Sequence, residues 1–181
     1  AASGATNFST QPITLGLVET IRSQIGGADT ITTGIGKDII LGGIGGDGIV
    51  ANDGEGTSKD ANNIVVGDSG YIDWSAADTG RVYAATTTAG GTLPGDDTVA
   101  SDIDRIWSTE PDDGGADTIT TGDADDIIIG GEDVDTIIGG DGDNLVFGDN
   151  GQITAAYAGL ASYNFSTQPI TLGLVETIRS L

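Results

Sequence analysis

The chain contains no cysteine, histidine or methionine among its 181 residues. Without cysteine it can form no disulfide and can use no thiol in catalysis, and without histidine it can build no histidine-dependent nucleophilic triad. Zinc and haem sites built on these side chains are excluded for the same reason. Together with the repeats described below, these absences lead us to expect no enzymatic activity.

Basic residues are also scarce, because 6 Lys and Arg stand against 28 Asp and Glu, for a formal net charge of −22. Such a surface repels phosphate backbones and anionic lipid, so we expect no nucleic-acid partner. No apolar run approaches the roughly 20 residues that span a bilayer, so we also expect no membrane insertion. Aspartate supplies 23 of the 28 acids and glycine 31 residues, a composition that favours turns or oxygen-rich cation sites over solvated helices.

A long internal repeat organises the chain. Residues 7–23, NFSTQPITLGLVETIRS, recur without change at 164–180, at an offset of 157 residues. We interpret the chain as one full 157-residue period followed by the start of the next. Since the chain also lacks a start methionine, we expect it to be a piece of a longer tandem array.

A weaker repeat lies inside the period. GGADTITTG at 26–34 returns at 114–122, and each half-period closes with the turn GD[SN]G, which contains Asp68 in the first half and Asp149 in the second. These matches divide the chain into non-repeat β segments at 1–23, 71–111 and 152–181, and repeat segments at 24–70 and 112–151.

Within both repeat segments the sequence has a period of nine residues. The sixth place holds aspartate in six of eight turns, and Asn63 and Asn144 take it in the other two. The eighth place is aliphatic in all eight turns, at Ile31, Ile40, Ile49, Val65, Ile119, Ile128, Ile137 and Val146. Glycine stands where a tight turn needs a positive φ, so each unit reads as a six-residue turn followed by a three-residue strand.

This pattern resembles the glycine-rich nonapeptide G-G-x-G-x-D-x-U-x of RTX (repeats-in-toxin) proteins, which occurs in large secreted bacterial repeat proteins and adhesins. The resemblance covers roughly 75 of the 181 residues. It implies an all-β fold, a calcium-loaded parallel β-roll in two tandem copies, with the non-repeat β segments packed on or between them. It also implies secretion in an unfolded state by a one-step route, and hence an extracellular or cell-surface location.

In such a roll two nonapeptides make one coil, and calcium lies between turns that are 18 residues apart. The resemblance implies that backbone carbonyls and the sixth-place aspartates hold the ions, roughly four to six in number. We expect 26–29 to stack on 43–47, 34–38 on 52–55, 114–117 on 131–135, and 122–126 on 139–143, with further pairs at the closing turns. The candidate ligands are Asp29, Asp38, Asp47, Asp53, Asp68, Asp117, Asp123, Asp126, Asp133, Asp135, Asp141 and Asp149.

Unneutralised, these carboxylates repel one another, so we expect calcium binding and folding to be one event. Six ions would change the net charge from −22 to about −10, which leaves the folded form acidic. The alternative interpretation of the aspartates is a solvated acidic surface without bound ions.

The seventh and ninth places point outward and differ between the two faces. One face is rich in threonine and is formed by Thr30, Thr32, Gly48, Val50, Thr118, Thr120, Thr136 and Ile138. The other is wholly apolar and is formed by Ile39, Leu41, Ile64, Val66, Ile127, Ile129, Leu145 and Phe147. Because an apolar face of this extent does not remain in water, we expect the segments 13–21, 70–74, 81–85, 102–107 and 151–158 to cover it as strands. Packing between chains is the alternative, and 13–21 could also form a short helical stripe.

These observations predict a structural module, such as an extender, matrix, surface-layer or filament subunit. Its partners would be neighbouring copies of the same repeat, in the same chain and possibly in other chains. A second hypothesis is an adhesin in which the 71–110 insert binds a glycan or protein through Trp74, Tyr83 and Trp107. A third is an accessory domain that helps a linked secreted enzyme to fold.

Overall fold

The computed structural model describes residues 15–22, 24–56, 58–74, 103–155, 163–164 and 170–178. All the regular secondary structure in these ranges is β-strand, so the predicted all-β class is confirmed. The strands are β1 Leu17–Glu19, β2 Thr30–Thr32, β3 Ile39–Leu41, β4 Gly48–Val50, β5 Ile64–Val66, β6 Gly70–Asp73, β7 Arg105–Ser108, β8 Thr118–Thr120, β9 Ile127–Ile129, β10 Thr136–Ile138, β11 Leu145–Phe147, β12 Gly151–Ala155, β13 Tyr163–Asn164 and β14 Thr171–Thr177.

The nine-residue units form two parallel four-stranded sheets. The strands with threonine-rich outer positions form one sheet in the order β10-β8-β4-β2, which we call the Thr-rich sheet. The strands with apolar outer positions form the other in the order β11-β9-β5-β3, which we call the apolar sheet. Each eighth-place residue is the middle residue of its strand, and these residues pair with one another along each sheet. The predicted strand positions are therefore confirmed.

The aliphatic side chains of the eighth place fill the space between the two parallel sheets. Ile49, Val65, Ile119 and Ile128 in the middle layers are fully buried and form one hydrophobic cluster. Ile31 and Ile137, in the first and last strands of the Thr-rich sheet, are only partly buried. The interior is thus complete in the middle of the stack and open toward its two ends.

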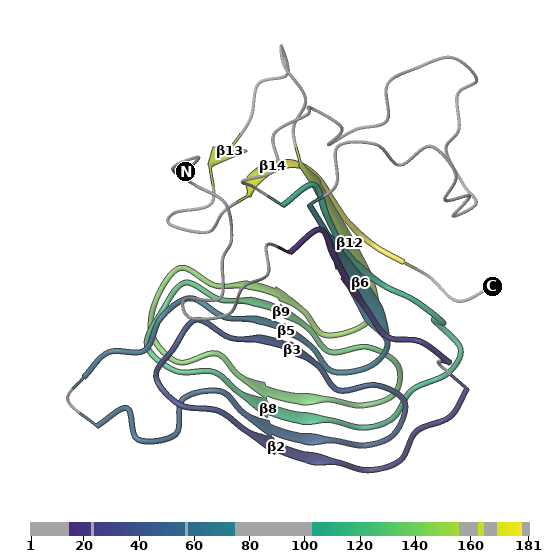
Figure 1. Ribbon diagram of the computed structural model, residues 1–181, viewed down its shortest axis with the longest axis horizontal. Coiled ribbons are helices and arrows are strands. Elements are labelled where there is room, and N and C mark those ends of the chain that lie inside the picture. Colours follow the sequence, from purple (N-terminus) through teal and green to yellow (C-terminus); the bar gives the residue numbers. More distant parts are fainter. Residues whose placement is uncertain are drawn as a thin grey trace.

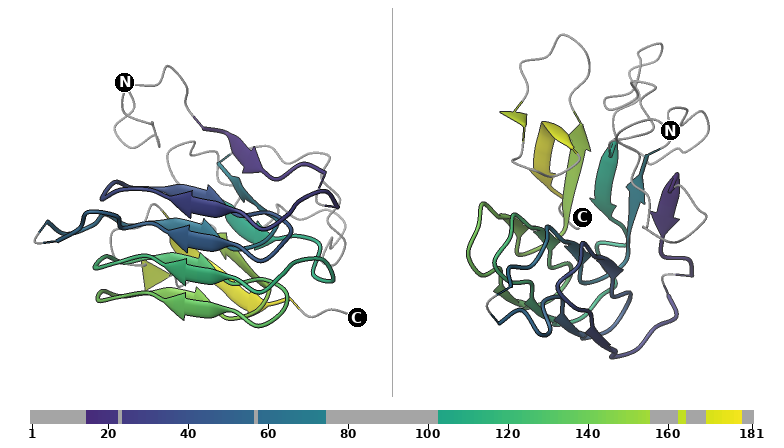
Figure 2. Two further views of the ribbon diagram at one scale, coloured as in Figure 1. Left: turned by 90° about the horizontal axis from the view of Figure 1, so that it is seen from below. Right: turned by 60° about the vertical axis from the view of Figure 1, so that its left-hand side comes forward.

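A third, antiparallel sheet covers the apolar sheet. Its strand order is β1-β6-β7-β12-β14-β13, and we call it the cover sheet. Figure 1 shows the three sheets as successive layers, and the right-hand view of Figure 2 shows the cover sheet from purple β1 to yellow β14. Ile72, Ile106 and Ile153 of the cover sheet and Ile127 and Ile129 of the apolar sheet are fully buried in one cluster.

This arrangement confirms that the chain covers its own apolar face. The segments predicted around 13–21, 70–74, 102–107 and 151–158 contribute β1, β6, β7 and β12, so within 15–22 the helical alternative is wrong. The predicted segment 81–85 lies outside the described residues. By contrast, the outer positions of the Thr-rich sheet include exposed side chains such as Thr30, Thr32 and Thr118.

The two repeat segments, 24–70 and 112–151, share their sheets. Strand β4 of the first segment pairs with β8 of the second, and β5 pairs with β9. The chain leaves the parallel sheets after β5 to form β6 and returns through β7, where the amide of Thr109 donates to the carbonyl of Ser69 at 2.8 Å. The chain therefore leaves and re-enters the parallel sheets at the same turn, and the two repeat segments form one stack.

Candidate metal centres along two turn edges

The turns that lead into the Thr-rich sheet stack along one edge, which we call the Asp68 edge. Here the carboxylate of each sixth-place aspartate accepts the backbone N–H of the aspartate one layer before it. The amide of Asp29 donates to Asp47 Oδ1 at 2.7 Å, that of Asp47 to Asp117 Oδ1 at 2.7 Å, and that of Asp117 to Asp135 Oδ1 at 2.9 Å. The predicted stacking of 26–29 on 43–47 and of 114–117 on 131–135 is confirmed. The bond from Asp47 to Asp117 connects the two pairs, so these hydrogen bonds form one continuous ladder along the edge.

The second oxygen of each of these carboxylates is left without a partner. The Oδ2 atoms of Asp47, Asp117 and Asp135 are buried and have no hydrogen-bond partner. A buried carboxylate oxygen without a donor is costly, so such an atom calls for a ligand. Asp47 and Asp117 are only 3% and 2% exposed.

Backbone carbonyls point into the same small spaces. A Cβ atom built at Gly67 would overlap both Asp117 Oδ2 and the carbonyl oxygen of Gly130. The same holds one layer away at Gly130, where a Cβ would overlap Asp135 Oδ2 and the carbonyl of Gly148. Carboxylate and carbonyl oxygens are the ligands that calcium prefers. Each space is thus lined by oxygen and kept open by the missing side chain of glycine.

Asp68 has a different role from the sixth-place aspartates. Its Oδ1 accepts the amide of Gly115 at 3.1 Å and its Oδ2 accepts the amide of Glu132 at 2.6 Å. Asp68 is 1% exposed and therefore joins two successive turns from the inside. Both of its oxygens accept backbone amides, so Asp68 links two successive turns by hydrogen bonds, and its role as a calcium ligand stays a prediction.

The carboxylates of this edge are difficult to ionise together. Burial, and then the nearby charges of Asp117 and Asp135, raise the pKa of Asp68 to about 7. Burial likewise raises the pKa of Asp117 to about 7, and the charges of Asp135 and Asp47 add to it. The pKa values of Asp47 and Asp135 are also raised, mainly by burial. A bound cation would remove this repulsion.

The turns that lead into the apolar sheet stack along the opposite edge, which we call the Glu55 edge. The amide of Asp38 donates to Asn63 Oδ1 at 3.0 Å, that of Asn63 to Asp126 Oδ1 at 2.7 Å, and that of Asp126 to Asn144 Oδ1 at 2.9 Å. The Oδ2 atoms of Asp38 and Asp126 are buried without a hydrogen-bond partner. Burial raises the pKa of Asp126 to about 6, although the nearby Thr121 hydroxyl lowers it.

The two asparagines explain why this edge has fewer free carboxylate oxygens. Asn144 Nδ2 donates to the carbonyl of Gly139 at 3.1 Å, and Asn63 Nδ2 donates to Asp60 Oδ2 at 2.8 Å. An amide group therefore occupies the place where an aspartate would present its second oxygen. These two turns therefore offer fewer carboxylate oxygens to a cation than the turns with aspartate at the sixth place.

Sequence reasoning missed Glu55 and Asp60, which support the fourth turn. This turn contains an insert of seven residues, around 57–63, that the second repeat segment lacks. Glu55 Oε1 accepts the amide of Asp123 at 3.0 Å, and Oε2 accepts the Asn52 side chain at 3.1 Å, which lowers the pKa of Glu55. The segment 52–55 begins beside 34–38, since the amide of Asp53 donates to the carbonyl of Thr33 at 2.9 Å and a Cβ built at Gly34 would lie 3.8 Å from the carbonyl oxygen of Asp53. The insert then places Asn63 opposite Asp38. The extra residues around 57–63 were the available signal.

The remaining predicted ligands are exposed. Asp29, Asp53, Asp123, Asp133, Asp141 and Asp149 lie at the surface of the turns. The stacking of 122–126 on 139–143 is confirmed, since the amide of Asp143 donates to Asp125 Oδ1 at 2.8 Å. Within the described ranges no three acidic side chains converge as a metal cluster. A cation at either edge would therefore depend on backbone carbonyls as much as on carboxylates.

No protein-family model, curated protein or solved structure matches this chain. Among the residues that the structure describes, no helix has the length and apolar character needed to cross a membrane.

Proposed function

We propose that the chain is a calcium-binding structural repeat module of a large secreted or cell-surface bacterial protein, and that its parallel sheets form a calcium-loaded β-roll of the RTX type. One observation carries this proposal: the Oδ2 atoms of the sixth-place aspartates Asp47, Asp117 and Asp135 are buried without donors, next to glycine carbonyls of the adjacent layer. This arrangement explains why aspartate and glycine recur with the same nine-residue phase.

Calcium suits these spaces better than other common cations. It accepts six to eight oxygen ligands in flexible geometry, whereas magnesium demands a near-ideal octahedron and retains water. Zinc prefers nitrogen and sulfur ligands, and the chain has neither histidine nor cysteine. Strands of three residues contribute little stability of their own, so neutralising the stacked carboxylates is coupled to folding. A module of this kind becomes rigid where calcium is abundant, outside the cell.

The aromatic residues favour a structural role over an adhesin. Trp74 is 1% exposed in the core under the cover sheet. Trp107 is half-buried, tilted against Tyr71 with ring centroids 5.7 Å apart, and its indole N–H donates to Thr154 Oγ1 at 3.4 Å. Both rings are used in packing, while Tyr83 lies outside the described residues. An accessory domain of a secreted enzyme would have the same fold and would differ by a linked catalytic domain.

A calcium titration followed by far-UV circular dichroism tests the proposal, with magnesium as the control ion. We expect a cooperative gain of β signal in calcium and no equivalent gain in magnesium. A chain that is already folded in chelator, with no further change on adding calcium, would show that folding does not depend on calcium and would overturn the proposal. A glycan array probed in calcium distinguishes the adhesin hypothesis from the structural role, because a purely structural module should bind no glycan on the array.

A further inference from the structure

The two ends of the stack expose apolar side chains that the middle layers bury. Of nine exposed large apolar residues in the described part of the chain, eight lie in the end layers: Ile21, Ile25 and Ile35 at the first, and Val134, Ile138, Val146, Leu174 and Val175 at the last. Val146 is 45% exposed although it has the inward-pointing eighth place, where Val65 and Ile128 are fully buried. Its exposure follows from the open end of the stack.

Val18 and Val175 are the same residue of the 157-residue repeat in two different environments. Val18, on β1, packs against the core cluster beneath the cover sheet. Val175, on β14, is 41% exposed, because β11 is the last strand of the apolar sheet and β14 extends beyond β12 in the sheet above. What Val175 lacks is the layer formed by β2 and β3.

The identical strands β1 and β14 use opposite backbone edges. The amide of Thr20 donates to Gly70 at the start of β6, whereas the amide of Ile178, the repeat counterpart of Ile21, donates to Asn150 just before β12. Consecutive amides of a strand point to opposite sides, so the edge that β1 uses on β6 faces away from β12 in β14. No strand of the described residues pairs with that edge over 174–176. Strand β13 pairs only with Thr171 and Leu172. One such strand can therefore pair with β12 of one copy and β6 of the next.

The structure already contains one junction of this kind. GGADTIT occurs at 26–32 and at 114–120, and inside the chain the second occurrence is held by Asp68, which accepts the amide of Gly115, and by Asp117, which accepts the amide of Asp47. By the internal repeat, Asp149 and Asp135 are the counterparts of Asp68 and Asp47 at the far end.

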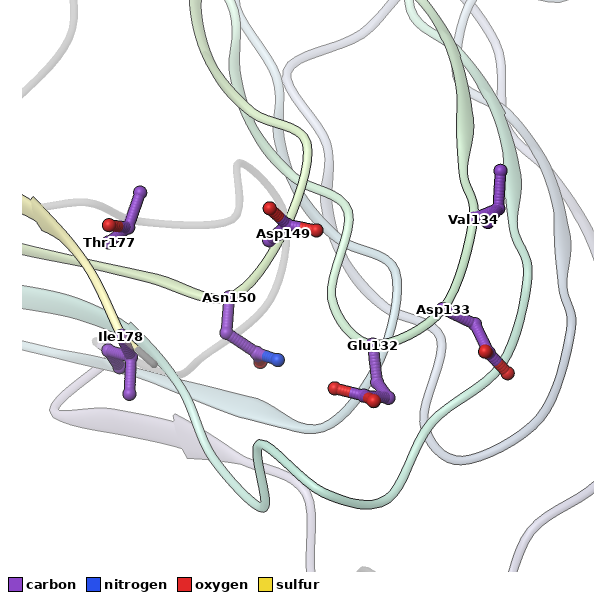
Figure 3. A pocket seen from close by; sticks show the side chains of 7 residues that line it. All are labelled: Glu132, Asp133, Val134, Asp149, Asn150, Thr177 and Ile178. Carbon is purple, nitrogen blue, oxygen red and sulfur yellow. The ribbon is translucent and has the colours of Figure 1, made fainter. Parts of the chain in front are cut away.

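Asp149 lies beside an open groove of about 640 Å³ that is also lined by Glu132, Asp133, Asn150 and Thr177 (Figure 3). The glycines also show that a neighbouring layer is missing at this end. A Cβ at Gly67 would overlap the carbonyl of Gly130 in the next layer, whereas a Cβ at its counterpart Gly148 would meet nothing within 4 Å.

We propose that this end, formed by β10, β11, β14 and the Asp149 groove, is the docking surface for the β1, β2 and β3 end of a second copy of the repeat. In the docked pair, Asp149 accepts the amide of Gly27 and Asp29 accepts the amide of Asp135. Strand β10 pairs with β2, β11 with β3, and β14 with β6 of the following copy. Successive periods then share three continuous sheets.

The proposal rests on the proposed function, because Asp135, Asp149 and Asp29 bring like charges together and need calcium between them. It also predicts a competition. When two separate chains join, the 14–20 segment of one and the 171–177 segment of the other require the same place, so one must leave its strand. Weakening either segment should therefore promote assembly.

Sedimentation velocity on the full chain tests the inference in saturating calcium, with circular dichroism on the same samples. We expect calcium-dependent oligomers that form faster in the variants Val18→Lys and Val175→Lys, which weaken the two identical segments separately. The double variant has no intact donor strand and should remain monomeric. Either single variant suffices if the other fails to fold.

In the Val18→Lys background, Gly148→Ala should weaken association about tenfold or more, since its Cβ would overlap the incoming layer. Gly48→Ala is the matched control, because a Cβ there also meets nothing within 4 Å and Gly48 lies on a middle strand. Folded monomers in all variants, or equal association of Gly148→Ala and Gly48→Ala, would overturn the inference. Failure to fold with calcium would instead count against the proposed function.

Discussion

The amide of Asp47 donates a 2.7 Å hydrogen bond to the carboxylate of Asp117, a residue 70 positions later in the chain. This bond continues the ladder from the first repeat segment into the second, and the other oxygen of Asp117 is buried without a donor. The pair therefore combines the two parts of the proposed site: one carboxylate oxygen fixes the turn and the other is left for a cation.

Asp117→Asn should act with opposite sign in the two states. An asparagine at this place can keep the hydrogen bond to the amide, as Asn63 does for Asp38 at 3.0 Å. Without calcium the variant should have more β signal than the parent chain, because a repelling charge is removed. With calcium it should bind at least about tenfold more weakly, because a ligand oxygen is lost.

Far-UV circular dichroism in chelator and isothermal calorimetry with calcium measure the two effects of Asp117→Asn. Asp112→Asn removes the same charge from an exposed loop residue and should change neither by a comparable amount. Unchanged calcium affinity in Asp117→Asn would exclude Asp117 as a ligand.

Lowering the pH should partly substitute for calcium in stabilising the folded chain. Burial raises the pKa of Asp68 and Asp117 from 3.8 to about 7, so the folded chain binds more protons than the unfolded chain between these values. The calcium-free chain should therefore gain stability as the pH falls from 8 to about 5.5 and lose it as the pH rises through 7. Far-UV circular dichroism of the calcium-free chain across this pH range measures the trend as a change in β signal. Stability that increases with pH over this interval would contradict it.

Gly67→Ala should be strongly destabilising. Its Cβ would overlap Asp117 Oδ2 and the carbonyl of Gly130, and the Asp117 carboxylate is held in place by the hydrogen bond from the Asp47 amide. We expect a loss of about 1–3 kcal/mol and a weaker response to calcium. Gly48→Ala, which meets no atom within 4 Å, is the control for an added methyl group, and equal unfolding midpoints for the two variants would contradict the tight oxygen-lined space.

The cover sheet should contribute a large share of the stability. Ile106 is fully buried at the centre of β7, so Ile106→Ala should cost about 2–5 kcal/mol of unfolding free energy. Ile138→Ala removes the same atoms from a residue that is 55% exposed and should cost within about 0.5 kcal/mol in the monomer. Chemical denaturation in saturating calcium compares the two, and a small effect of Ile106→Ala would mean that the cover sheet is not part of the cooperative unit.

The sequence was sufficient to predict the strands because one periodic constraint acts on every turn. A middle aliphatic residue such as Ile49 or Ile119 must face inward, and this fixes the two outward positions beside it. The apolar outer face then required a cover, and segments such as 102–107 alternate well enough to provide it. These inferences depend on local spacing and burial, which one sequence displays directly.

Other features depend on pairing that local spacing does not reveal. The join between Asp47 and Asp117 crosses the whole 71–111 segment, so the two repeat segments looked like separate copies. Asp68 stands outside the nine-residue phase. That its two oxygens accept the amides of Gly115 and Glu132 could not be predicted without knowing where these residues lie. The insert before Asn63 likewise hid the partner of Asp38, because the support from Glu55 is specific to this turn.

Stacked aspartates are 18 residues apart within a repeat segment, as Asp29 and Asp47 are, and 70 residues apart where Asp47 meets Asp117. These spacings recur in each period and bear on how fast a long array can fold. The entropy lost in closing a loop depends on the number of residues in it. Where each layer closes on the one before through a loop of fixed length, that cost per layer does not grow with the number of periods. Folding can then advance from one layer to the next as the chain is released, and a very long array needs no distant contact to begin.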